Sequence, residues 1–406
     1  MKKNKIIEYI TIVCLSLSYF IYSSLFKINY YFSICVGLIL FVLMSCVLII
    51  NKKAYVTKKE FWYYAGILLL PEVLLIIYSF IIIMAKNNSG NITIEKYIAR
   101  SLLFISAMLA SIGITGLYKK NAIDVIFKAA VLNYIVYIVV FIMENGIANL
   151  FYYTYLTVSG NEGIKSILEA HEVTFVFGLL FLYYLFTGYD KNKKKVILCL
   201  IFSILGFKRI MMVAILIVFV LFYATKKTRL FTKKLALIST IGLIIFSYFW
   251  LYLVKENAMQ SISENESINF MGRLSLYKLI SKEFTLNLSF VGRGLGYIAV
   301  WGEKNLYITN GIALHSGILQ MYIENGFIAF FSYLIYKVYF IAKIIRDGEN
   351  EKNYIIYILI MIYTIICWST DNVATYYNYL IASNIITLTL LNNFNNMKEI
   401  ENCDKR

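Results

Sequence analysis

Charged side chains are scarce in this sequence. Only 15% of its 406 residues are Asp, Glu, Lys or Arg, whereas 60% are hydrophobic. A typical soluble domain has about 25% charged residues, and it could not hide this much apolar surface from water. The composition therefore excludes a water-soluble fold and leaves almost no sequence for a separate soluble domain.

The sequence also lacks the patterns of a disulfide framework or a metal site. Its six cysteines follow no metal-binding or disulfide spacing, and five of them lie inside apolar runs, as small buried hydrophobic residues do. No Asp-x-Asp pair or carboxylate cluster stands at the outer end of a run. We expect no metal ion and no cofactor.

The net charge of +16 does not indicate a nucleic-acid partner, because no basic stripe or arm is present. The basic residues form short clusters between apolar runs, which is typical of contacts with membrane lipid headgroups. We therefore expect no nucleic-acid binding.

What the sequence has is a series of apolar runs, most of them near the roughly 20 residues that cross about 30 Å of hydrocarbon. They predict an all-α, polytopic integral membrane protein of about twelve transmembrane helices, with residues 1–406 as a single membrane domain. The runs are Ile6 to Phe26, Asn29 to Ile50, Phe61 to Met84, Tyr97 to Tyr118, Val125 to Asn145, His171 to Thr187, Val196 to Phe207, Ile210 to Thr225, Leu235 to Val254, Ile318 to Ala342, Tyr354 to Ser369 and Ala374 to Leu391.

The distribution of basic residues predicts the orientation. If the runs cross alternately, about 26 of the 39 Lys and Arg residues lie on the side of both termini. The positive-inside rule makes that side cytoplasmic. The predicted location is the inner (cytoplasmic) membrane, with both termini in the cytoplasm.

Two long segments are then external, Gly146 to Ala170 and residues 255–313, the latter between the ninth and tenth helices. Within 255–313, Phe270, Tyr277 and Phe284 belong to a three- and four-residue apolar spacing that predicts an amphipathic helix lying on the bilayer or the bundle. Such a helix would fix the position of Arg273.

The seventh run is too short for a span, since it covers only about 18 Å before Lys208 and Arg209. Either its helix begins earlier, among lysines that extend toward the interface, or the two cations lie in a recess below the outer surface. We favour the recess.

The sequence has only two histidines, His171 and His315, and both fall at predicted outer ends of spans. His315 shares that side with Arg209, Arg273 and Arg293. Several guanidinium groups beside one base suit a substrate that carries phosphate or diphosphate. Arg293 lies in GRGLGY, which we interpret as a tight turn because no βαβ unit surrounds it.

Two further carboxyl groups fall inside predicted spans. Glu72 follows the only proline, Pro71, and either a transport role or a hydrogen bond to a neighbouring helix fits it. Glu324, nine residues after His315, is too far along a regular helix to touch it, so we expect an interhelical hydrogen bond near Gln320, with a proton relay as the alternative.

The order of these features resembles the O-antigen and capsule repeat-unit polymerases (Wzy-type) and the related O-antigen ligases. The resemblance rests on the sequence segments LGFKRIMM, GRLSLYKL, GRGLGY, LHSGILQMYIENGFIAF with its H-x-x-x-L-x-x-x-x-E-x-G pattern, and EAHEVTFVFGLLFLYYL. The match extends over most of the chain in topology.

The resemblance implies metal-independent glycosyl transfer on the outer leaflet, from an undecaprenyl-diphosphate-linked oligosaccharide to a second lipid-linked repeat unit. It implies catalytic roles for His315, Arg273 and Arg209, and substrate binding by Arg293, His171, Glu172 and Lys208. Flippase and chain-length regulator proteins would be partners, together with membrane lipid. A ligase that uses another acceptor, and a lipid-linked oligosaccharide flippase or proton-coupled transporter, are the alternatives.

Overall fold

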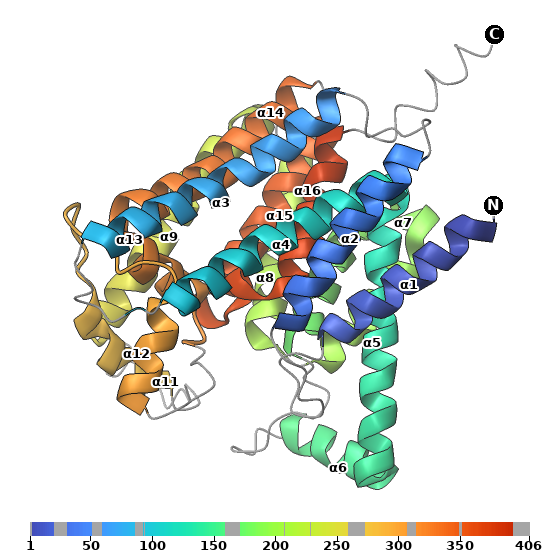
Figure 1. The fold of residues 1–406 in the computed structure, drawn as a ribbon, viewed down its shortest axis with the longest axis horizontal. Coiled ribbons are helices and arrows are strands. Elements are labelled where there is room, and N and C mark those ends of the chain that lie inside the picture. The colour runs from blue at the N-terminus through green and yellow to red at the C-terminus, as the bar shows by residue number, and fades with distance from the viewer. Residues whose placement is uncertain are drawn as a thin grey trace.

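The computed structural model describes residues 2–19, 31–50, 59–85, 92, 94–158, 171–206, 208–227, 229–258, 273–306, 314–348 and 351–392. Within these ranges the regular structure is entirely helical, which confirms the predicted all-α class. The helices, shown in Figure 1, are α1 Lys2–Ser18, α2 Tyr31–Ile50, α3 Lys59–Ala85, α4 Ile94–Tyr118, α5 Ala122–Asn145, α6 Ile147–Val158, α7 His171–Leu205, α8 Arg209–Lys227, α9 Arg229–Lys255, α11 Arg273–Ile280, α12 Tyr297–Leu306, α13 Gly317–Ile335, α14 Ile341–Asp347, α15 Glu351–Thr370 and α16 Tyr377–Asn392.

A helix coincides with most or all of each predicted apolar run. The described ranges contain six stretches that are long and apolar enough to cross a membrane. Two of these stretches, Ile94–Asn145 and Glu172–Leu205, each contain two predicted runs. The chain is therefore a membrane-embedded helical protein, and the number of twelve crossings stays a prediction.

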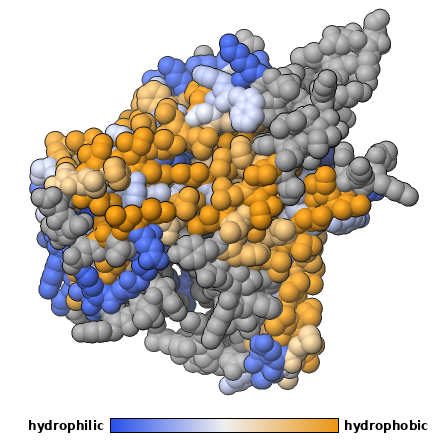
Figure 2. All heavy atoms as spheres, viewed as in Figure 1, coloured by the Kyte–Doolittle hydropathy of each residue, from blue (hydrophilic) through white to orange (hydrophobic). Residues whose placement is uncertain are grey.

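The centre of the bundle is formed by α15 and α16. In α15, 89% of the most apolar window is buried, compared with 28% in α9, so α9 lies at the periphery. Large apolar side chains such as Leu74, Ile81 and Phe249 are exposed on α3 and α9. Figure 2 shows that hydrophobic residues cover the middle of the visible face, with hydrophilic residues gathered at the top and at the lower left. Such a surface suits contact with lipid chains.

Helix α7 is a hairpin of two antiparallel arms that turns at Gly188, where the backbone is not helical. The rings of Phe177 and Phe202 lie 4.9 Å apart, although a straight helix would separate residues this far along the chain by more than about 35 Å. The sixth and seventh predicted runs are these two arms. The second arm begins well before Val196, so the alternative of an earlier helix start is the correct one.

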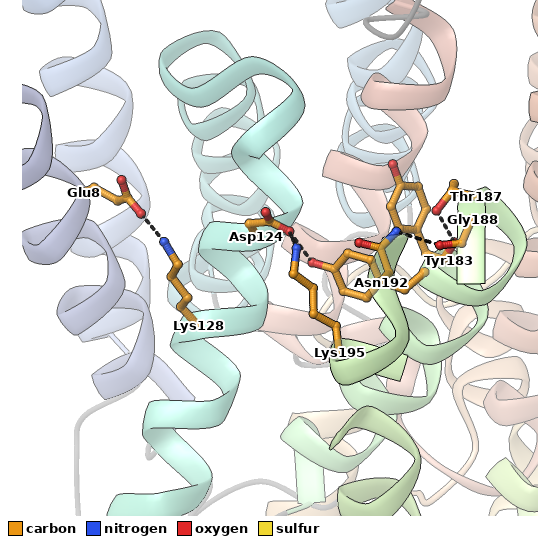
Figure 3. A network of polar contacts seen from close by, with 9 residues as sticks. Glu8, Asp124, Lys128, Tyr183, Thr187, Gly188, Asn192 and Lys195 are labelled. Atoms are coloured by element: carbon orange, nitrogen blue, oxygen red, sulfur yellow. Dashed lines mark hydrogen bonds and ion pairs between the residues drawn. The ribbon is translucent and has the colours of Figure 1, made fainter. Parts of the chain in front are cut away.

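Polar contacts tie α1, α5 and α7 together near this turn, as Figure 3 shows. The carboxylate of Asp124 in α5 accepts hydrogen bonds from the hydroxyl of Tyr184 at 2.7 Å and from the ammonium of Lys195 at 2.6 Å. Lys128 pairs with Glu8 of α1. Because these groups are partly exposed, each pair contributes little stability, but together they fix the spacing of the three helices.

Helices α3 and α13 are joined where Pro71 interrupts the hydrogen bonds of α3. Proline has no N–H, so the carbonyl of Ile67 has no partner four residues on, and the hydroxyl of Tyr336 donates to it at 3.0 Å. The neighbouring Glu72 is buried; its Oε1 accepts from the Tyr333 hydroxyl at 2.8 Å and lies 3.1 Å from the Nζ of Lys337. These contacts agree with a structural role for Glu72.

Lys337 and Tyr336 belong to a π-helical turn, Tyr336–Phe340, that links α13 to α14. A small cavity of about 30 Å³ lies between this turn, α3, α15 and α16, and Glu72 and Lys337 line it. A cavity of this size has room for about one or two water molecules.

The segment between α9 and α13 is partly helical. Part of the predicted amphipathic pattern falls on α11 and the 3₁₀ turn Ser281–Glu283, and Tyr277, Ile280 and, directly after the turn, Phe284 are buried. Helix α11 therefore packs on the bundle. Phe270, also part of the predicted pattern, lies outside the described residues.

The GRGLGY sequence forms the predicted turn, and this turn enters a break in α13. Gly292, Gly294 and Gly296 have φ values of 89°, 99° and 89°, which favour glycine. The amides of Arg293 and Gly294 donate to the carbonyls of Ile323 and Glu324 at 2.8 Å each, next to Gly326, where α13 is not helical. The turn thus supplies partners for backbone groups that the break leaves open.

Candidate functional site

A buried carboxylate, Asp371, stands where α15 ends and is the centre of a polar cluster. Its Oδ2 lies 3.2 Å from the Nζ of Lys208. Its Oδ1 accepts hydrogen bonds from the hydroxyl of Tyr376 and, at 2.8 Å, from the amide of Asn372. Both acceptor atoms are therefore engaged, as a buried charge requires.

The surroundings hold Asp371 in its charged form. Burial alone would raise the pKa of this carboxyl, but the Lys208 ammonium, the hydrogen bond from Tyr376, the nearby His315 and the amide of Asn372 together bring the pKa below its usual value. Asp371 is thus an anion throughout the physiological pH range.

Three contacts of residues 315–317 hold the turn at His315 beside Asp371. The carbonyl of His315 accepts a hydrogen bond from the Tyr277 hydroxyl at 3.2 Å. The amide of Ser316 donates to the side chain of Asn372 at 3.1 Å, and that of Gly317 donates to the carbonyl of Asp371 at 2.9 Å. With φ at 48°, His315 has a left-handed backbone that costs about 1–2 kcal/mol outside glycine. This tight turn directs a half-buried imidazole at the start of α13.

The next residue, Ser316, closes the turn. Its hydroxyl oxygen accepts from the amide of Leu319 at 3.3 Å and from the indole of Trp250 in α9 at 3.2 Å. A serine in this N-cap position satisfies an amide that the first turn of a helix leaves without a partner. The start of α13 is therefore fixed to α9 as well as to the loop after α15.

Arg273 reaches the same end of α15 from the first position of α11. Its Nη1 donates to the carbonyl of Thr370, the last residue of α15, at 2.8 Å. That carbonyl lies at the negative end of a helix dipole, where a cation is favoured. In the described part of the chain this is the one hydrogen bond of the guanidinium, so further N–H groups can bind a ligand.

The two cations at the start of α8 differ in their surroundings. Lys208 is 7% exposed, pairs with Asp371, and has its Nζ 5.7 Å from the ring centre of Phe175. Arg209 is exposed, and among the described residues no hydrogen bond or ion pair ties it to Asp371. Lys208 is therefore buried in the bundle, whereas Arg209, one residue along the chain, is exposed.

Arg293 belongs to a different cluster. Its Nε donates to the carbonyl of Glu283 at 3.1 Å, and its Nη2 lies 3.7 Å from the carboxylate of the same residue. The guanidinium also covers the ring of Tyr297, whose hydroxyl donates to Glu283. The described structure therefore joins Arg293 to α12 and not to His315.

Glu172 and His171 begin α7. The carboxylate of Glu172 is 3% exposed and accepts from the amides of Asn378 and Tyr379, the latter at 3.2 Å, at the start of α16. It thus caps α16, as an acidic group at a helix N-terminus does. The side chain of His171 lies outside what the structure describes.

Asp371, Tyr277 and Tyr376 are the site residues that the sequence reasoning missed. Asp371 did carry a signal, because it is the only charged residue between Lys352 and Lys398. A lone carboxylate between two apolar runs is costly and indicates function. The two tyrosines carried none, since the sequence has 35 of them.

The assembled groups provide a base beside cations. His315 offers an imidazole, Arg273 a guanidinium, and the Lys208–Asp371 pair is neutral as a unit, so the cluster keeps a positive charge. Among the described residues, no three His, Cys, Asp or Glu side chains are grouped as a metal site would require. Such a set suits an anionic leaving group and a hydroxyl that must lose a proton.

No family model, no curated protein and no solved structure matches this chain.

Proposed function

We propose that the protein is a polysaccharide polymerase of the capsule or O-antigen type. The observation that carries the proposal is the meeting of His315 and Arg273 around the end of α15, beside the charged Asp371. These residues come from segments far apart in the sequence. The membrane-embedded fold adds support, because such an enzyme works on lipid-linked sugars.

The proposed topology has twelve spans, both termini in the cytoplasm, and residues 255–313 outside the inner membrane. The donor is a sugar chain on undecaprenyl diphosphate, and the acceptor is a hydroxyl of a second lipid-linked repeat unit. The active site faces the outer leaflet. A flippase that delivers the repeats and a chain-length regulator are the proposed protein partners.

In the proposed reaction the acceptor oxygen attacks the anomeric carbon of the donor, and the bond from that carbon to the diphosphate oxygen breaks. The hydroxyl proton passes to His315. The bonding electrons leave with the lipid diphosphate, whose growing negative charge Arg273 and Arg209 stabilise where water is scarce. Lys208 contributes less charge because Asp371 already neutralises it.

A deletion strain tests this function. We expect single lipid-linked repeat units to accumulate on the outer leaflet of such a strain. Repeats retained in the inner leaflet would indicate a flippase instead, and finished polymer still attached to its lipid would indicate a ligase. Restoration of polymer by the wild-type gene, but not by His315→Ala at equal protein level, would tie the activity to the site.

A further inference from the structure

Two side chains of opposite charge, Glu324 beside the glycine turn that enters α13 and Arg100 on α4, have buried polar atoms. Glu324, two residues before the break at Gly326, is 1% exposed. Arg100 lies on α4, with its Cζ 5.3 Å from the ring centre of Phe104. Both belong to stretches apolar enough to cross a membrane, where a charged group is costly unless it has partners.

The two oxygens of Glu324 have different surroundings. Oε1 accepts from the amides of Gly296 and Ile298 at 3.2 and 3.4 Å, and from the side chain of Gln320 at 3.4 Å. Through this oxygen Glu324 caps α12, so the expected bond to Gln320 is present, although within one helix. Oε2 is buried, and in the described part of the chain it has no hydrogen-bond partner.

Within the described ranges, Arg100 has buried donors without a partner, where Glu324 has a buried acceptor without one. Its Nε and Nη2 are buried donors that likewise lack a partner among the described residues. Gly296, whose amide donates to Glu324, packs against the backbone of Lys96, one turn before Arg100 on α4. The guanidinium acts electrostatically on the Glu324 carboxylate, yet the two side chains do not approach within the 4.0 Å of an ion pair. Both side chains therefore keep buried polar atoms that need a partner.

The chemistry of these unpartnered atoms selects one kind of group. A buried donor or acceptor left unsatisfied costs about 1–3 kcal/mol, and more when it is charged. An anion would suit Arg100 but be repelled by Glu324, and a cation would have the opposite problem. A neutral hydroxyl suits both, because its oxygen accepts from the guanidinium while its hydrogen is donated to Oε2.

We propose that Arg100 and Glu324 form a binding site for a single hydroxyl group, supplied by an ordered water molecule or by a saccharide. The site connects α4 with the break in α13 and with the start of α12. It does not depend on the proposed reaction, because neither Arg100 nor Glu324 takes part in the proposed glycosyl transfer.

The direct test is a cryo-EM map of the full-length protein in lipid nanodiscs, recorded with and without N-acetylglucosamine as the probe. We expect density within hydrogen-bond distance of both Arg100 and Glu324 Oε2. Density for one oxygen that is the same with and without the sugar identifies water. Density that becomes larger when the sugar is added identifies a saccharide hydroxyl. A direct Arg100–Glu324 ion pair, or the absence of density between the two side chains, would overturn the proposal.

Thermal unfolding of variants provides a second test. Arg100→Gln and Glu324→Gln should each lower the unfolding temperature, because each leaves the other charge buried alone. The double variant should unfold above the temperature that the sum of the two losses gives. Additive losses would contradict a shared site. Lys96→Gln is the matched control, since Lys96 lies on the same helix in a partly exposed pair with Glu303 and should change little.

Discussion

His315 and Arg273 stand in the same cluster but should fail differently when replaced. A base matters mainly while the acceptor attacks, whereas a guanidinium also holds the diphosphate before the reaction. We expect His315→Ala to lower polymer formation about 100- to 10,000-fold while lipid-linked substrate still binds. Purified variants in liposomes, with protein levels matched, provide the measurement. Near-normal polymer from His315→Ala would put the chemistry elsewhere.

At Arg273 the shape of the charge is expected to matter. Arg273→Ala should lose most activity, and Arg273→Lys should recover only part of it, because an ammonium is a point charge where a guanidinium is a planar fork. The carbonyl of Thr370 would also lose its partner. Lys278→Ala, an exposed change on the same helix, serves as the control and should keep full activity. Equal losses at both positions would indicate damage to α11 instead.

Asp371→Asn should destabilise the protein, because it leaves Lys208 buried without its counter-charge. Removing one partner of a buried ion pair costs about 3–5 kcal/mol. The folded-state pKa of Asp371 lies below its unfolded value near 3.9, so its stabilisation is present above that pH and is lost as the pH falls through the folded pKa. Below about pH 3.9, unfolding in detergent micelles should therefore show a smaller acid-induced loss for the variant than for the wild type. The same slope in both proteins would contradict this assignment.

Among the elements, the joint between α3 and α13 allows a test that uses proline chemistry. Tyr336→Phe should cost about 0.5–1.5 kcal/mol, because it removes the only hydroxyl donor to the Ile67 carbonyl in the described structure. In a Pro71→Ala background the cost should shrink, since the alanine amide can bond to that carbonyl. Tyr339→Phe in the same turn is the control. An unchanged cost in the Pro71→Ala background, measured by thermal unfolding, would contradict the joint.

Element positions could largely be predicted from the sequence because long apolar runs have one stable solution in a membrane. The breaks inside the helices could not be predicted in the same way. The turn of α7 at Gly188 lies near a charged stretch that marked it, but the break at Gly326 depends on a contact with Gly292, 34 residues earlier. His315 and Arg273 could be predicted as site residues, because they share one predicted side of the membrane with other basic residues. The roles of Asp371 and Tyr277 could not be predicted, because they depend on contacts between distant segments.

For the whole molecule, the proposed orientation can be tested with single cysteines in a background without the native ones. Positions Lys194 and Lys234 should be protected from an impermeant thiol reagent in intact cells, and positions Lys278 and Leu288 should be labelled. All four residues are exposed in the structure, so protection would reflect the membrane and not burial in the protein. Labelling of the two lysines on the cytoplasmic side would reverse the orientation and remove the site from the outer leaflet.

The glycine turn inside α13 limits how this protein can be recombined with others. A loop whose ends merely meet a bundle can be exchanged as a module, but here residues 290–296 complete the hydrogen bonds of the helix that follows. A chimera that imports a foreign segment between α9 and α13 would leave the amide and carbonyl groups around Gly326 open. Only exchanges that carry the turn and α13 together preserve both, so any swap meant to change sugar preference would have to move α13 as well.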